Sequence, residues 1–151
     1  MKTLYESLLD DDLITKTDKM IKDEIKLFLK ETYNGVVKIS KKPNADGKYE
    51  VSSTGNVSVK NRDIISLTNG TFIWTVVGGD FYCNNCNSLT SLEGAPKKVG
   101  GTFCCDMCIS LISLEGAPKE VGGRFYCNNC AGKFTIEDVK KVSNVKGEIK
   151  C

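Results

Sequence analysis

The residues with the clearest chemical potential are cysteines, of which the chain contains eight. Six of them form three Cys-x-x-Cys pairs: Cys83 with Cys86, Cys105 with Cys108, and Cys127 with Cys130. Two such pairs about 20 residues apart are a strong pattern for a zinc site, and a single pair can act as a redox dithiol. The chain has no histidine, so a metal site could draw only on cysteine and carboxylate ligands. The cysteines therefore have three interpretations: zinc ligands, redox groups, or small apolar residues of a core.

The pairs recur because the sequence around them repeats. Units begin at Gly78, Gly100 and Gly122, 22 residues apart, and each contains the motif Phe-x-Cys-x-x-Cys. Weaker copies in 57–65 and 145–151 are displaced from their neighbours by 24 residues. A fixed period of this length is typical of a solenoid, in which stacked coils bury a core that no single coil could bury. The pattern predicts five successive parallel strands, near 57–60, 80–84, 102–106, 124–128 and 147–151.

The repeat also bears on the cysteines. Side chains alternate along a strand, so the phenylalanine and the first cysteine of each unit face inward together. Cys83 aligns with Val59 and Cys86 aligns with Arg62, and neither valine nor arginine is a zinc ligand. A zinc site would also fold each pair back around one ion, which conflicts with a straight strand. We therefore favour a ladder of buried free thiols, with the six paired cysteines as zinc ligands kept as the second interpretation.

The string SLEGAPKEVGGxFxCxxC, which begins at Ser113, resembles the leucine-rich-repeat-like proteins of bacteriophages and of some bacterial genomes. The resemblance covers roughly residues 50–130. It implies an α/β fold in the form of a short leucine-rich-repeat-like solenoid with a parallel strand ladder. It specifies the fold more closely than the function. Because small phage proteins often act against host proteins, the resemblance also implies a host-directed role, such as inhibition of a CRISPR nuclease or another bacterial defence system.

A solenoid needs its ends covered, and the segment before the repeats fits that role. A helix is predicted over 17–32, starting at Thr17 or Asp18 and followed by Asn34-Gly35 as its stop signal. Its apolar face would comprise Met20, Ile21, Ile25, Phe28 and Leu29. A β-hairpin is predicted over 36–53, where two strand-like segments flank the turn sequence KKPNADG.

The sequence is therefore expected to form two regions. Residues 1–53 would form the N-terminal cap, and residues 54–151 would form the solenoid. Trp74 is expected in the core, on the return stretch of the first coil. Thr135 is expected to open a short helix near 135–143, with an acidic first turn and lysines in its last turn.

The outward-facing strand positions form the usual binding surface of such a fold. Strand alternation places ten residues there: Ser58, Lys60, Asp80, Tyr82, Thr102, Cys104, Arg124, Tyr126, Glu148 and Lys150. Tyrosine and arginine often anchor protein interfaces, so the candidate binding residues are Asp80, Tyr82, Thr102, Cys104, Arg124 and Tyr126. Cys104 is expected to face solvent as a neutral residue. The alternative is a solvated face without a binding role.

Composition narrows the classes of function. The lack of histidine excludes Ser-His-Asp and Cys-His catalysis, and we predict neither enzyme activity nor a cofactor. The formal net charge is +2 and the lysines are spread evenly, so direct nucleic-acid binding is not expected. No apolar run reaches the roughly 20 residues of a membrane helix. Asp10, Asp11 and Asp12 interrupt the N-terminal stretch where a secretory signal would lie, so we expect a cytoplasmic location, in the host cell if the protein is phage-encoded.

The sequence therefore predicts a non-catalytic protein–protein interaction module, working as an inhibitor or adaptor. Its partner would be a host protein or a protein–RNA complex. An open strand edge could also allow a homodimer. The alternative function is a zinc-stabilised nucleic-acid-binding protein.

Overall fold

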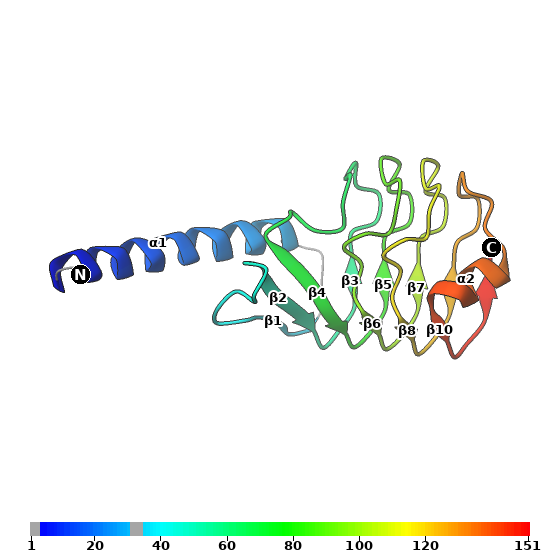
Figure 1. Ribbon diagram of the computed structural model, residues 1–151. Coiled ribbons are helices and arrows are strands. Elements are labelled where there is room, and N and C mark those ends of the chain that lie inside the picture. The colour runs from blue at the N-terminus through cyan, green and yellow to red at the C-terminus, as the bar shows by residue number, and fades with distance from the viewer. Residues whose placement is uncertain (1–3, 31–34) are drawn as a thin grey trace.

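A computed structural model describes residues 4–30 and 35–151, with side chains from Thr17 onward. The molecule is an α/β solenoid with a long helix, α1 (Leu4–Leu29), at one end and a short helix, α2 (Ile136–Val142), at the other (Figure 1). Between the helices, the chain winds through successive coils that each add a strand to two sheets. We refer to residues 54–77, 78–99, 100–121 and 122–146 as coils 1 to 4.

The five predicted strands are present and pair in parallel in the predicted order. They are β3 (Val57–Ser58), β5 (Phe81–Tyr82), β7 (Phe103–Cys104), β9 (Phe125–Tyr126) and β11 (Ile149–Lys150). Val57 aligns with Phe81, Phe103, Phe125 and Ile149 along the sheet, which matches the repeat spacing in the sequence. The strands are two residues long, shorter than predicted, and a turn begins two residues after each of the first four.

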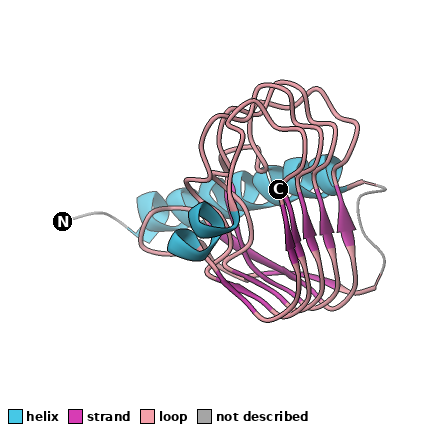
Figure 2. Cartoon of the chain, turned by 90° about the vertical axis from the view of Figure 1, so that its right-hand side faces the viewer, coloured by secondary structure: helices cyan, strands magenta, loops and turns pink. Residues whose placement is uncertain are grey.

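A second, six-stranded sheet combines the predicted hairpin with four strands on stretches where only the return of the chain was expected. Its strands, in spatial order, are β1 (Val37–Ile39), β2 (Tyr49–Ser53), β4 (Phe72–Val77), β6 (Lys98–Val99), β8 (Glu120–Val121) and β10 (Asn144–Val145). Viewed along the solenoid, the two sheets meet at an angle, and loops close the remaining side (Figure 2). Buried Trp74 lies on β4, as predicted for the core, and its indole nitrogen donates to the Leu67 carbonyl at 3.2 Å.

Glycine pairs make the corner between the two sheets. In coil 3, a Cβ atom on Gly100 would lie 2.2 Å from the carbonyl oxygen of Gly78 in the coil below. Real Cβ atoms cannot approach backbone that closely, so the coils could not stack at this corner with any other residue.

Aromatic rings fill the centre of the solenoid. Phe81 stacks on Phe103 with ring centroids 5.7 Å apart, and Phe103 lies 5.1 Å from Phe125. Toward α1 the row continues through Trp74 and Phe72. The repeated phenylalanine therefore builds one continuous core rather than four separate ones.

Helix α1 begins well before the predicted start. Thr17 and Asp18 lie inside the helix rather than at its N-cap, because the preceding residues contain no glycine or proline that would stop it. Asp18 accepts a hydrogen bond from the buried Tyr49 hydroxyl instead. Burial and this bond raise the pKa of Tyr49 to about 12.

The apolar face of α1 is largely as predicted. Ile25 and Leu29 are buried, and Ile21 and Phe28 pack partly against the same core. Met20 is 65% exposed, so its placement on the core face was wrong. The helix ends at Leu29, and the predicted stop at Asn34 lies outside the described residues.

Arg62 connects α1 to the solenoid. Its guanidinium donates to the carbonyls of Phe28 at 3.1 Å and Lys30 at 3.3 Å, where the last turn of the helix leaves carbonyls without helical partners. The same group lies 5.8 Å from the centre of the Phe28 ring. Arg62 thus occupies the position that cysteine takes in later coils and uses it to fasten the helix.

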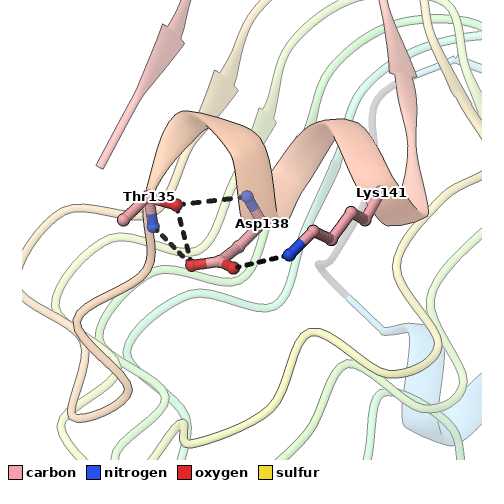
Figure 3. Close-up of polar contacts among 3 residues, drawn as sticks. All are labelled: Thr135, Asp138 and Lys141. Atoms are coloured by element: carbon pink, nitrogen blue, oxygen red, sulfur yellow. Dashed lines mark hydrogen bonds and ion pairs between the residues drawn. The ribbon is translucent and has the colours of Figure 1, made fainter.

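The predicted hairpin and C-terminal helix are both present. β1 pairs antiparallel with β2, and β2 pairs in parallel with β4, so the hairpin continues the six-stranded sheet. At α2, the Thr135 hydroxyl accepts from the Asp138 amide at 3.2 Å, and the Asp138 carboxylate accepts from the Thr135 amide at 2.9 Å (Figure 3). Lys141 lies 3.9 Å from the same carboxylate. This reciprocal capping fixes where the helix begins.

Among the described residues, no helix is long and apolar enough to span a membrane.

Candidate binding surfaces

The structure brings the predicted outward-facing residues of the five-stranded sheet into ordered rows. One row contains Ser58, Tyr82, Cys104, Tyr126 and Lys150, each in register with the next. Tyr82 and Tyr126 therefore lie directly on either side of Cys104. We call this row the strand face.

Cys104 does not face solvent as the sequence predicted. It is only 8% exposed, and the reason is its position between two tyrosines on adjacent strands. Burial raises the pKa of its thiol to about 11, so the reactive thiolate is disfavoured at neutral pH. Strand alternation correctly gives the direction of this side chain but not what covers it.

The other predicted residues of this surface are bound to one another. Asp80 accepts from the Tyr82 hydroxyl at 2.8 Å, and the bond raises the pKa of Tyr82. Asp80 also accepts from the Thr102 amide at 2.6 Å, so its carboxylate links coils 2 and 3. Arg124 donates to the Tyr126 hydroxyl at 3.2 Å. These polar groups make the strand face rigid, since their side chains already have internal partners.

The six paired cysteines form two columns inside the solenoid. Those at the second position of each pair hydrogen-bond to the preceding coil: Cys86 to the Val59 carbonyl, Cys108 to the Cys83 carbonyl and Cys130 to the Cys105 carbonyl, at 3.1, 3.1 and 3.2 Å. All six are buried. The thiols therefore both fill space and satisfy backbone carbonyls between coils.

The same columns bear on metal binding. In the part of the chain that the structure describes, which includes all eight cysteines, no three Cys, Asp or Glu side chains are grouped to hold a metal ion. Burial raises the pKa of Cys108 to about 12 and that of Cys83 still more clearly above its ordinary value. Metal ligation requires thiolates, which burial opposes at Cys83 and Cys108, whereas the contact with Cys105 lowers the pKa of Cys130.

Sequence reasoning missed an apolar surface on the loop side of coil 3. Met107, Ile109 and Ile112 are 51%, 64% and 68% exposed. We call these three residues the loop patch. The repeat contains a signal for this patch, because the aligned positions of coil 2 hold the polar residues Asn85, Asn87 and Thr90.

Two surface grooves adjoin the loop patch and share Phe134. The first is lined by Ile109, Ala131 and Phe134 together with Cys127, Cys130 and Cys151. The second lies between coil 3 and α2, and its apolar lining residues are Ile112, Leu114, Ala117, Phe134 and Val142. Charged residues of both signs border the second groove: Glu115, Lys119, Asp138 and Lys141. A lining that combines apolar and charged residues is typical of protein interfaces.

Met107 also adopts a backbone conformation that is unfavourable for methionine. It lies at the turn after β7 with φ of 58°, in the left-handed region. The equivalent residues Asn61, Asn85 and Asn129 adopt the same conformation, and asparagine tolerates it better than methionine. Coil 3 thus places an exposed apolar side chain where the backbone favours asparagine.

No protein-family model matches the chain, and comparisons with curated proteins and with solved structures give no significant match.

Proposed function

We propose that the protein is a non-catalytic binding module whose protein partner docks on the loop patch and the adjoining groove between coil 3 and α2. The observation that carries this proposal is the difference between coils 2 and 3. Fifteen of their 22 aligned residues are identical, so coil 2 reports what the fold itself requires at each position of coil 3.

Contacts within the fold account for two of the other four differences between these coils. Lys98 of coil 2 is aligned with Glu120 of coil 3, and the two side chains form an ion pair of 3.2 Å across paired strands. Asn84 becomes Asp106, whose carboxylate accepts from the Asn128 amide at 2.6 Å. Among the described residues, no comparable contact explains the loop patch, which replaces three polar residues by exposed apolar ones. Such a change favours association, because apolar area is removed from water only when a partner covers it.

The strand face is the second surface that a partner could use. Its tyrosines project from β5 and β9, on either side of β7, but their hydroxyls are bound within the molecule. The loop patch has the larger exposed apolar fraction and no such partners. We therefore place the main contact on the loop patch and treat the strand face as its possible extension.

The class of partner is a proposal that rests on the sequence resemblance alone. That resemblance favours a phage-encoded inhibitor directed at a host protein or protein–RNA complex, such as a CRISPR nuclease. The described surface fits a protein rather than free nucleic acid, because both signs of charge border the groove.

The test is affinity capture from host lysate with the wild type and a variant that converts the loop patch to the coil 2 sequence. This variant carries Met107→Asn, Ile109→Asn and Ile112→Thr. Each capture is divided into nuclease-treated and untreated halves and read by mass spectrometry. We expect a protein that the wild type retains in both halves and that the variant loses.

A matched control variant carries Tyr82→Ala and Tyr126→Ala, which alter the strand face and leave the loop patch intact. Thermal unfolding of both variants confirms that each is folded. If the control loses the partner and the loop-patch variant keeps it, the contact lies on the strand face and the proposed site is wrong. If every captured protein disappears with nuclease and the loop-patch variant captures the same proteins as the wild type, the proposed function itself is contradicted and the nucleic-acid alternative is favoured.

A further inference from the structure

The last coil brings two thiols into contact. Cys151 follows β11 and lies beside Cys127, since Lys150 pairs with Tyr126 and the Cys127 amide donates to the Lys150 carbonyl at 2.8 Å. The two Sγ atoms are 2.8 Å apart, with the Cys127 thiol donating toward Cys151. In coil 3 the equivalent thiol, Cys105, instead donates to the Tyr126 carbonyl. The thiols of Cys105 and Cys130 also interact with each other, but both are buried, so the Cys127–Cys151 contact differs in including an exposed thiol.

We propose that Cys127 and Cys151 are a redox-active pair that forms a disulfide by exchange with a low-molecular-weight disulfide such as oxidised glutathione. Neighbouring residues on paired strands are about 4.8 Å apart, within the Cα separation of about 4.4–6.8 Å that a disulfide spans. The backbone pairing already holds the two residues at this separation. Bond formation thus requires only a rotation of the side chains.

Accessibility determines the order of the two exchange steps. Cys151 is exposed, whereas Cys127 is only 2% exposed and cannot be reached by a bulky disulfide. Burial raises the pKa of both thiols, and the hydrogen bond between them raises the pKa of Cys127 while lowering that of Cys151. Cys151 is therefore the thiol that ionises first and attacks first.

The balanced reaction has two steps. The Cys151 thiolate attacks glutathione disulfide, forms a mixed disulfide and releases one glutathione thiolate. Cys127 then loses its proton, attacks the Cys151 sulfur and releases the second glutathione thiolate. Two protein thiols are oxidised, one glutathione disulfide is reduced to two glutathiones, and the two thiol protons pass to these leaving groups.

The Cys127–Cys151 disulfide would change the groove beside the loop patch. Both cysteines line the groove that also contains Ile109 and Phe134. A covalent link between β9 and β11 would fix that wall of the groove and hold the last strand in place. A reducing compartment keeps the pair as thiols, and an oxidising shift closes it.

The test uses the full chain, reduced and then incubated with glutathione disulfide, followed by intact mass under non-reducing conditions. We expect the wild type to lose two hydrogens as a monomer. Cys127→Val, which takes the residue found at Val59, should stop at one glutathione attached to Cys151. Cys151→Ser should gain neither a glutathione nor a disulfide. Cleavage after Glu148 should release residues 149–151 only after reduction of the wild type.

Cys130→Ser is the matched control, because Cys130 lines the same groove as the proposed pair. It should form the disulfide as the wild type does. The proposal is overturned if Cys130→Ser abolishes the internal bond, if Cys151 links two chains instead, or if the wild type retains both thiols or stops at the mixed disulfide. None of these outcomes depends on which partner binds the loop patch.

Discussion

Coils 2 and 3 are nearly the same sequence and have the same backbone path, yet they present different surfaces. With one exception, the buried positions are identical in the two coils, including the phenylalanine, both paired cysteines, both leucines and the final valine. Of the seven differences, only Cys104 is buried, and it is covered by residues of neighbouring coils. The comparison therefore separates residues that build the solenoid from residues that give one coil its own surface.

The first prediction concerns a residue that both coils share. Phe103→Ala should destabilise the protein by about 3–5 kcal/mol, since the ring is fully buried between Phe81 and Phe125. Urea unfolding followed by circular dichroism measures this loss. Phe81→Ala should cost a similar amount, because it sits in the same column. A loss below about 1 kcal/mol for either variant would contradict a continuous aromatic core.

A shared core explains why much of the fold could be predicted from the sequence. Three of the parallel strands follow from the repeated Phe-x-Cys-x-x-Cys motif and the outer two from its weaker copies, and α2 follows from Thr135 with Asp138 three residues later. The six-stranded sheet could not be predicted in the same way. Its strands in coils 2 and 3 each bury a single valine, Val99 or Val121, which is too short a pattern to indicate a strand.

The candidate site was harder to predict for a different reason. Strand alternation identified the direction of Tyr82, Cys104 and Tyr126, but the burial of Cys104 depends on which residues stand beside it in other coils. The loop patch lies outside the strands, where alternation gives no information. Only a position-by-position comparison with coil 2 separates Ile109 and Ile112 from the surrounding repeat.

The second prediction tests the thiols that the coils share. In the unfolded chain the Cys83 thiol ionises near its ordinary pKa of 9.0, and in the folded chain burial keeps it protonated to higher pH. Stability from this thiol is thus complete below pH 9 and falls as the pH rises above it, by about 1.4 kcal/mol for each unit of pH until the folded pKa is reached. Cys83→Val, which copies Val59, should remove this part of the alkaline loss.

Urea midpoints at pH 7.5 and pH 10, measured with reductant present, provide the comparison. At pH 7.5 the variant should be within about 1.5 kcal/mol of the wild type, because the substitution nearly conserves volume. At pH 10 the variant should lose about 1.4 kcal/mol less than the wild type. Cys151→Ser serves as the exposed control and should change this difference much less. Equal alkaline losses in wild type and Cys83→Val would show that the Cys83 thiol is not held protonated by the fold.

The smallest predicted effect concerns a residue by which the two coils differ. Met107→Asn should stabilise the protein by about 0.5–1 kcal/mol, because asparagine tolerates the left-handed conformation at φ of 58° better than methionine does. The reciprocal change in coil 2, Asn85→Met, should destabilise it by a similar amount, partly through loss of the 3.0 Å hydrogen bond from Asn85 to Asn61. Thermal unfolding of the two single variants and their combination measures both effects.

If Met107→Asn is destabilising, methionine is required by the fold of coil 3, and the stability cost that we attribute to binding at the loop patch does not exist. If Met107→Asn is stabilising and also weakens partner capture, the methionine side chain lowers stability but contributes to binding. That combination is the pattern expected of a contact residue.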